Sequence, residues 1–502
     1  MFVGLITYAF TLCLTFFSRK FFLNNLGADF LGLTSTFYNI LSLMNLAELG
    51  IGSAICYNLY KPLAEDDCAT VNEIVSVIGW LYRWVGSSLL IISCLMLFFL
   101  PWMFAKSSLS LTLIFFCFIC SVAGNLFGYF LNFKQVILEA DQRMYLVTGY
   151  YQGCNFLKVI IQMFLLLWTK NYYIWIIVEL LFSIVNSVIL NITIKRKYPL
   201  VRATIKNGKR FLRKYSIILT HIKQIFLKRL SIVVLLQIDQ LLVYLFFSLS
   251  MVTYYANYQI IFDKLLQFFG SLVAGTYSSV GNMVAKESST KVLRVFYELL
   301  SSYIFIGGIL SISFYHLLPS FITVWLGKEY VLSQRILGLM AFYLFVRITV
   351  LCVNAFLNGY GLFYDVWASW TMVFIKLAVS LVAGYYWGIE GILLGSISAV
   401  VCIEALWRPY FLFKCGFKNK QLKYWLHSFV EYGMLLFAFG FSLFVIRKTG
   451  LHSENGWCSW IAYSILWVCL LSVSSGILFF LVSHGFRDAV DRVKNIILSK
   501  CL

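Results

Sequence analysis

The chain has 502 residues, of which 61% are hydrophobic and only 12% are charged, and its formal net charge is +19. A soluble globular protein is about 45–50% apolar and about 25% charged, so the composition excludes a cytosolic enzyme, a disordered chain and a secreted disulfide scaffold. Most of the 13 cysteines lie in apolar runs, where Cys behaves as a small hydrophobic residue, and no Cys/His cluster has the spacing of metal ligands, so we expect neither disulfides nor a metal site.

The apolar residues gather in long blocks that are typical of helices crossing a bilayer. A helix needs about 20 apolar residues to cross the hydrocarbon, and backbone in lipid must satisfy its own hydrogen bonds. The first block lacks the basic start and the cleavage site of a signal peptide, so we interpret it as a span. The pattern predicts an all-α membrane protein with fourteen spans, near 2–17, 30–58, 78–104, 109–133, 146–168, 172–194, 225–249, 253–283, 298–320, 332–357, 366–387, 390–413, 426–446 and 459–483.

Basic residues are concentrated in alternate connections between these spans. If both termini are cytoplasmic, the cytoplasmic segments hold 27 of the 40 Lys and Arg, and the opposite segments hold 8. By the positive-inside rule, we therefore expect both termini in the cytoplasm. The charge lies on one membrane face, which argues against nucleic acid as a partner. The longest polar break, 195–229, is interpreted either as a topogenic loop near anionic lipid or as a hinge between two lobes.

The residues around the second span resemble a known transporter family. Residues 26–63 read LGADFLGLTSTFYNILSLMNLAELGIGSAICYNLYKPL, with Glu48-Leu49-Gly50 and the exit Leu59-Tyr60-Lys61-Pro62 as the most specific part. This stretch is similar to the signature of Wzx-type flippases of lipid-linked oligosaccharides, within the multidrug/oligosaccharidyl-lipid/polysaccharide exporter superfamily. Looser matches are residues 138–145, Gln237-Ile238-Asp239, and Asp263-Lys264, which resembles an acidic–basic pair of lipid II flippases.

The resemblance implies a bacterial plasma-membrane transporter that works by alternating access. Its lobes would be 1–222 and 223–413, with a helix pair and a cytoplasmic tail in 414–502. Its substrate would be an undecaprenyl-diphosphate-linked oligosaccharide for O-antigen, capsule or exopolysaccharide, and its transport would be coupled to an ion. Membrane lipid, a polysaccharide polymerase and chain-length proteins are the implied partners; no cofactor is implied.

Ionisable groups inside the spans are functional candidates, because charge in hydrocarbon is unfavourable. Several form polar stripes at helical spacing: Asn155, Lys158 and Gln162; Glu179, Ser183 and Asn186; Lys264 with Asn257 and Gln267; Arg347 with Asn354 and Asn358. Phosphate oxygens accept charge-assisted hydrogen bonds from Arg and Lys. We therefore predict that cations bind the diphosphate and that acids couple an ion. The candidate cations are Arg19, Arg83, Lys158, Lys264, Arg347 and Lys376, and the candidate acids are Glu48, Glu179, Asp239 and Asp263.

Other interpretations of these residues and of the chain stay open. Polar stripes also bond helices together without a ligand, Arg83 suits an interfacial anchor, and any acid here suits a structural ion pair. The chain has no P-loop and no catalytic constellation, so we expect no enzyme. The alternative functions are an oligosaccharide polymerase or ligase, for which a large outer loop is missing, and a small-molecule antiporter of the same superfamily.

Overall fold

The computed structural model describes residues 2–45, 51–65, 67–105, 107–141, 143–199, 201, 205–215, 230–231, 234–235, 237–362, 366–418, 421–448 and 456–501. Every regular element among these residues is helical, which confirms the predicted all-α class. The chain divides into two compact units, Met1–Thr253 and Tyr254–Leu502, and the division falls in α10 (Leu249–Lys286). The predicted lobe boundary at 222 lies outside the described residues.

Ten helices of the described part are long and apolar enough to cross a membrane, and each coincides with a predicted span. The first two predicted spans fall mainly on α1, and the eighth falls on α10. The seventh, 225–249, is described at 230–231, 234–235 and 237–249, and residues 237–246 are helical. In the first unit the helices are α1 (Phe2–Met44), α2 (Ile51–Ala64), α3 (Cys68–Met103), α4 (Leu111–Leu131), α5 (Gln135–Ala140), α6 (Met144–Thr169), α7 (Tyr172–Lys197), η2 (Ile205–Asn207) and α8 (Gly208–Lys214).

The long helix α1 is broken at a glycine. Gly27 has φ 78° and ψ 168°, a backbone conformation that glycine adopts without the steric penalty of a Cβ atom. The predicted first span ends too early, at residue 17, because Ser18, Arg19 and Lys20 interrupt the apolar run. The helix continues through these residues, since hydropathy does not decide where backbone hydrogen bonding stops. The break between the first two helical segments is therefore Gly27.

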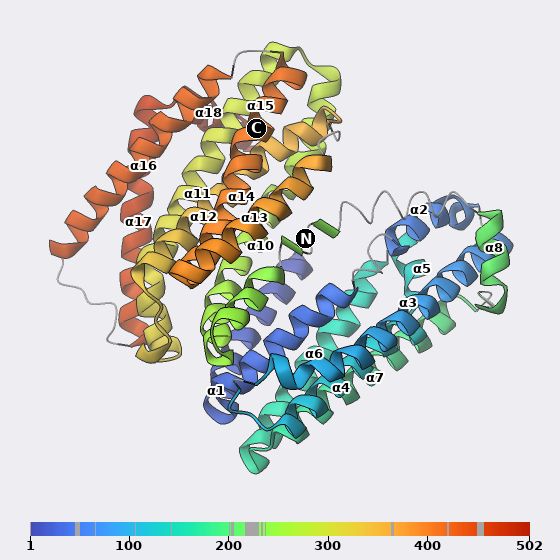
Figure 1. The fold of residues 1–502 in the computed structure, drawn as a ribbon. Helices are drawn as coiled ribbons and strands as arrows, with labels where there is room; N and C mark the ends of the chain where they lie inside the picture. The colour runs from blue at the N-terminus through green and yellow to red at the C-terminus, as the bar shows by residue number, and fades with distance from the viewer. Residues whose placement is uncertain are drawn as a thin grey trace. The chain divides into compact units, whose positions relative to one another are not determined.

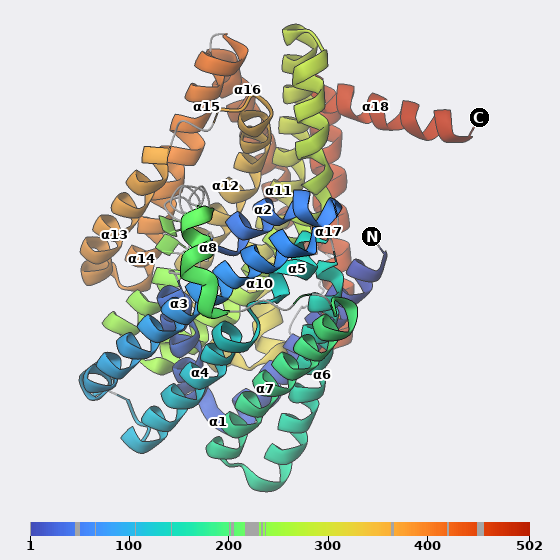
Figure 2. The same cartoon turned by 90° about the vertical axis from the view of Figure 1, so that its right-hand side faces the viewer.

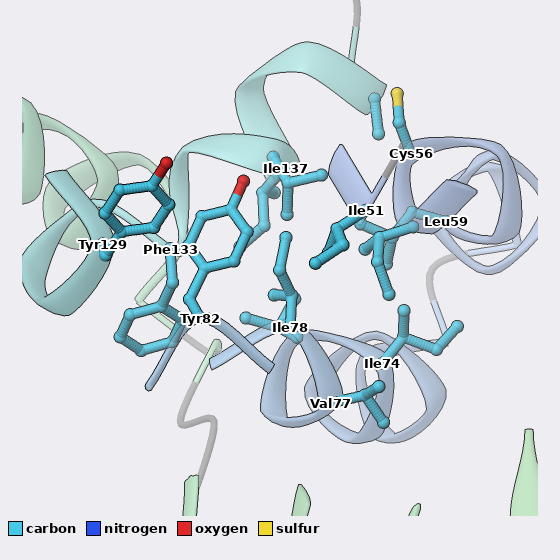
Figure 3. Packing of buried hydrophobic residues seen from close by; sticks show 14 of the residues in the cluster. Ile51, Cys56, Leu59, Ile74, Val77, Ile78, Tyr82, Tyr129, Phe133 and Ile137 are labelled. Atoms are coloured by element: carbon cyan, nitrogen blue, oxygen red, sulfur yellow. The ribbon is translucent and has the colours of Figure 1, made fainter. Parts of the chain in front are cut away.

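A hydrophobic cluster joins α2, α3 and the end of α4 with the short α5 (Figure 3). Ile55, Ile78 and Ile137 contribute one fully buried side chain each from α2, α3 and α5. Ile205 of η2 and Phe211 of α8 pack against the same cluster. Part of the basic stretch 195–229 is therefore folded onto the end of the first unit.

Helix α8 is held closely against the first turns of α3. A Cβ atom on Gly208 would lie only 2.3 Å from the Cβ of Trp80, so this contact requires a glycine. Lys214 Nζ donates to Glu73 Oε2 at 2.6 Å, and the Tyr215 hydroxyl donates to the same oxygen at 2.7 Å. The bond to Glu73 raises the pKa of Lys214 above its ordinary value, so this basic residue stays charged at neutral pH.

The second unit is built around α11, which packs against α12, α16, α17 and α18. Phe296 of α11 is fully buried and lies within 6.2 Å, between ring centroids, of Phe356, Phe413, Phe417 and Tyr424. Figure 1 shows α11, α12 and α14 side by side within this unit. Its elements are the rest of α10, α11 (Ser289–Trp325), η3 (Lys328–Tyr330), α12 (Gln334–Gly359), α13 (Val366–Trp387), α14 (Ile389–Ala399), η4 (Val400–Trp407), α15 (Arg408–Phe411), η5 (Leu412–Phe417), α16 (Leu422–Lys448), α17 (Trp457–Val482) and α18 (His484–Cys501).

The helix that follows Gly388 contains two π-helical stretches. α14 continues without a break through η4, a π-helix, then α15, and then η5, a second π-helix. The predicted span 390–413 lies on this continuous helix, which extends four residues further, to Phe417. Pro409 has no N–H to donate, and it occupies the start of α15, where the π geometry is interrupted.

Helices α16 and α17 both pack against α11, and α17 does so near the C-terminal end of α11. Trp467 of α17 is fully buried, and its ring stacks on His316 of α11 with centroids 3.7 Å apart. His316 Nε2 and the Tyr463 hydroxyl lie 2.8 Å apart. The predicted last two spans are therefore packed parts of the second unit.

Candidate functional site

Two of the predicted polar stripes face each other in the first unit, on α6 and α7. Lys158 Nζ lies 2.6 Å from Glu179 Oε1. Gln162, which is 1% exposed, donates to Glu179 Oε2 at 3.1 Å and to the Trp175 carbonyl at 3.2 Å. We call Lys158, Gln162 and Glu179 the first polar cluster. Both oxygens of its carboxylate are thus engaged by donors from α6.

The first polar cluster borders a cavity of about 340 Å³ inside the first unit. The Glu179 side chain is 45% exposed and lines this cavity, whereas the Lys158 side chain is 17% exposed. The wall therefore presents a carboxylate, with the ammonium group paired to it. The lining combines hydroxyls, an amide and aromatic rings with apolar side chains, and it consists of Thr34, Tyr38, Leu41, Cys117, Cys120, Ser121, Gly124, Asn125, Trp175, Ile176, Glu179, Leu180 and Ser183.

A network of amides and hydroxyls holds the helices around this cavity. Asn45, after α1, and Asn125 of α4 exchange side-chain hydrogen bonds of 3.3 and 3.0 Å, and the Tyr129 hydroxyl donates to Asn45 at 2.9 Å. Ser183 of α7 donates to the Gly124 carbonyl at 2.9 Å. Interhelical bonds of this kind are the expected structural use of polar residues in membrane helices, so the amides orient the wall of the cavity.

A second polar cluster lies in the second unit and consists of Arg347, Asn354, Glu404 and Arg408. Glu404 lies between two guanidinium groups, with Arg408 Nη1 at 3.3 Å and Arg347 Nη1 at 3.8 Å. Arg408 Nη1 also donates to Asn354 Oδ1 at 2.8 Å. The predicted stripe of Arg347 and Asn354 on α12 is thus completed by residues of η4 and α15.

The surroundings of the second polar cluster combine charge with irregular helix geometry. Glu404 belongs to the π-helix η4; such turns are rare and occur frequently at functional sites. Asp263 of α10 also acts electrostatically on Arg347, and Phe262 beside it stacks on Tyr343 with ring centroids 5.3 Å apart. Two guanidinium groups and the carboxylates of Glu404 and Asp263 are thus gathered in this part of the second unit.

The other predicted cations lie in varied surroundings. Lys264 Nζ donates to Gln267 Oε1 at 3.4 Å, on the predicted stripe of α10. Lys376 is 2% exposed, on α13. Arg83 is exposed on α3, next to Trp84, and Arg19 is half-buried on α1.

The predicted acids also differ in their environments. Asp263 accepts a hydrogen bond from Gln259 at 3.2 Å, and Asp239 is 8% exposed. Glu48 lies outside the described residues, together with the rest of the Glu48-Leu49-Gly50 motif. Glu179, by contrast, has two side-chain partners, Lys158 and Gln162.

Arg408 of the second polar cluster and Asn45 of the amide network are missing from the predicted sites. The spacing of Glu404 and Arg408, four residues apart, is the signal that pairs them on one helical face. For Asn45 the sequence holds no local signal, since its partners are 80 and 84 residues away.

Solved transporters share this fold. The chain is similar to a lipid II flippase, MurJ, in an inward closed conformation, with a TM-score of 0.70 and 15% identity over 96% of this chain and 99% of that one. It is also similar to an inward-facing multidrug resistance MATE family transporter of the MOP superfamily, with a TM-score of 0.63 and 15% identity over 80% of this chain and 96% of that one. No family model and no curated protein matches the sequence. The chain is thus a multi-pass membrane protein with the fold of these transporters.

Proposed function

We propose that this protein flips undecaprenyl-diphosphate-linked oligosaccharides across the bacterial plasma membrane for surface polysaccharide assembly. The fold shared with a lipid II flippase supports a lipid-linked substrate, and the resemblance of residues 26–63 to Wzx-type flippases supports an oligosaccharide. The observation that carries the proposal is the second polar cluster, in which Arg347 and Arg408 share one carboxylate inside apolar helices. Buried or partly buried charge of this kind is retained in membranes for function.

The guanidinium groups of the second polar cluster suit a diphosphate. Arg347 is 3.8 Å from Glu404 and its side chain is 30% exposed, so its ion pair is longer than that of Arg408, at 3.3 Å. A diphosphate offers oxygens to both guanidinium groups in bidentate geometry, which a single carboxylate does not satisfy. Lys264 would add a second kind of cation from α10. The lipid tail would remain in the bilayer while the headgroup crosses, with the two units moving in alternating access.

The cavity of the first unit has a lining of the kind that binds sugars. Hydroxyls, an amide and a carboxylate on its wall suit sugar hydroxyl groups, and Trp175 and Tyr38 offer rings to sugar faces. Glu179 is also suited to couple proton movement. When its carboxylate is charged it holds Lys158, and protonation would weaken that ion pair and free the ammonium group.

Complementation of polymer export in a strain that lacks the gene tests the proposal. Arg347→Ala removes a charge-assisted bond to phosphate, about 1.5–3 kcal/mol, and should weaken substrate binding about 10- to 100-fold and reduce export. Arg347→Lys should retain more export than Arg347→Ala because the charge is kept. The matched control is Arg335→Ala, which removes an exposed arginine from the start of the same helix and should leave export unchanged.

One outcome would contradict the proposed diphosphate site. Full export by both Arg347→Ala and Lys264→Ala, at normal protein level on a blot, would mean that these cations are structural. If Arg347→Ala loses export because the protein itself is lost, Arg347→Lys separates the effect of charge from the effect on folding. Substrate length should stay unchanged in every variant, because a flippase changes only the leaflet, whereas a polymerase or ligase changes the product.

A small-molecule antiporter is the second candidate function. The fold shared with a MATE transporter favours it, and a cavity of about 340 Å³ with a carboxylate on its wall is of a size that suits a small organic cation. Sensitivity of the deletion strain to cationic drugs, with normal surface polysaccharide, would favour this candidate over the flippase.

A further inference from the structure

The C-terminal helix α18 follows directly after the last predicted span but runs in another direction. α17 ends at Val482, Ser483 is extended with φ −85° and ψ 112°, and α18 begins at His484. Figure 2 shows α18 crossing the direction of α17 and α11. The buried Ser483 accepts from the Phe486 N–H at 3.2 Å and donates to Glu431 at 2.6 Å. The start of α18 is therefore anchored at one end of the helices of the second unit.

Two ion pairs determine which face of α18 meets α11. Arg294 Nε lies 2.9 Å from Asp488 Oδ2, and Arg492 Nε lies 2.8 Å from Glu298 Oε2. Positions 488 and 492 are four residues apart on α18, and 294 and 298 are four apart on α11, so one face of each helix is used. The Phe486 ring also packs against Phe305, with centroids 4.8 Å apart. These contacts define how α18 is rotated about its axis.

The exposed apolar residue of α18 lies on the side opposite to its ion pairs. Val490 is about 160–200° around the axis from both Asp488 and Arg492, and its side chain is 38% exposed. Phe486, one turn earlier, is covered by Phe305 and Phe479. In the sequence the apolar repeat continues from Val490 to valine at 493 and isoleucine at 497. We call the side of α18 that carries Val490 its apolar stripe.

The neighbouring surface indicates what covers this stripe. The last residues of α17 are also apolar and exposed, with Phe480 at 49%, Leu481 at 66% and Val482 at 50%. In a membrane span such residues face acyl chains, so the stripe of α18 continues a lipid-facing surface at the end of a span. The residues 484–501 contain four basic and two acidic side chains, and Lys494 is exposed. A bilayer surface offers acyl chains to the stripe and anionic phosphates to the basic groups.

We propose that α18 lies in the headgroup region of the bilayer, with its apolar stripe toward the acyl chains, and that it binds anionic lipid there. The ion pairs with α11 hold the polar side of α18 away from the hydrocarbon. The helix is thereby an interfacial element that connects the membrane surface to α11. This proposal is independent of the substrate that the protein transports.

Site-specific photo-crosslinking in the full-length protein tests the position of α18. Benzoylphenylalanine replaces Val490 in one variant and the neighbouring Asp491 in the matched control, and both proteins are reconstituted in vesicles. One set of vesicles contains phosphatidylethanolamine with phosphatidylglycerol, and the other contains phosphatidylcholine alone. Position 490 faces the acyl chains in this proposal and position 491 lies about 100° further around the helix, so position 490 should give severalfold more lipid adducts than position 491.

The lipid composition and a charge variant complete the test. Adducts at 490 should be more abundant with phosphatidylglycerol than with phosphatidylcholine, and Lys494→Gln should reduce this difference about fivefold, the equivalent of about 1 kcal/mol per basic residue. Equal lipid adducts at 490 and 491 would overturn the proposed orientation of the helix. Protein adducts at 490 in native membranes, in place of lipid adducts, would mean that a protein covers the stripe. An identical yield in both vesicle types would overturn the preference for anionic lipid.

Discussion

The ion pair between Lys158 and Glu179 predicts that its two partners respond unequally to mutation. At 2.6 Å and an effective dielectric constant near 20, the attraction is about 6 kcal/mol before desolvation is subtracted. Glu179→Gln leaves the mostly buried ammonium group of Lys158 without this counter-charge. Because Glu179 is 45% exposed, screening reduces the loss below the 3–5 kcal/mol of a fully buried pair. We expect Glu179→Gln to destabilise the protein by about 2 kcal/mol.

The opposite substitution should be milder. Lys158→Met keeps the length of the apolar stem, and the carboxylate of Glu179 keeps its bond from Gln162 and its access to the cavity. The expected loss is about 0.5–1 kcal/mol. In the double variant Lys158→Met/Glu179→Gln no unpaired charge is left, so its stability should lie near that of Lys158→Met. The two substitutions should therefore be coupled by about 1–2 kcal/mol.

Thermal unfolding of the purified variants in one detergent and at one scan rate measures this cycle. For a unit of this size about 1 kcal/mol corresponds to about 2–4 °C, so Glu179→Gln should lower Tm by about 4–8 °C. Lys158→Met should lower it by less than half of that. Equal losses in the two single variants, or additive losses in the double variant, would refute the explanation based on unequal exposure.

Three further predictions concern packing and helix ends. Gly391→Leu should prevent the close approach of α14 to α13 and disturb size-exclusion behaviour, since even a Cβ atom there would lie 2.0 Å from the Ala383 carbonyl oxygen. A Cβ atom at Gly440 meets no atom within 4 Å, so the control Gly440→Leu should leave size-exclusion behaviour unchanged. Asp67→Ala should lower Tm at neutral pH because the Asp67 side chain caps the N-terminus of α3. Hydrogen bonds at this cap lower the pKa of Asp67. The stability that the cap contributes is therefore present above the unfolded pKa and is lost as pH falls through the folded pKa. Gly27→Ala should lower Tm by about 2–8 °C, since the break at φ 78° strains any residue with a Cβ by about 1–2 kcal/mol.

The sequence predicted the helices better than it predicted their partners. Hydropathy located ten of the described spans because lipid requires long apolar runs. The stripes around Lys158 and Glu179 were visible separately, since helical periodicity places polar residues on one face. That these two stripes form an ion pair depends on α6 and α7 being neighbours, which periodicity alone does not determine.

The second polar cluster shows the same limit. The predicted span 390–413 includes both Glu404 and Arg408, but the sequence analysis did not predict the π-helical turn at Glu404. In the structure Glu404 lies between Arg347 of α12 and Arg408. The contact with Arg347 depends on the packing of η4 on α12, which periodicity along one helix does not determine.

The orientation of the chain in the membrane is the last prediction, and η2 provides its most direct test. Asn207 is exposed at the end of η2, and the adjacent α8 is packed on α3, so a cysteine at 207 is reachable by a reagent without unfolding. If the positive-inside count is correct, Asn207→Cys in a cysteine-free background should resist an impermeant thiol reagent in intact cells and react after lysis. Glu329→Cys in η3, which is exposed and lies in a segment predicted on the outer side, should react in intact cells. The opposite pattern at the two positions would invert the orientation. It would place the basic stretch 195–229 on the outer side, and the attraction of basic residues to anionic lipid of the cytoplasmic leaflet would then not explain the charge distribution of the chain.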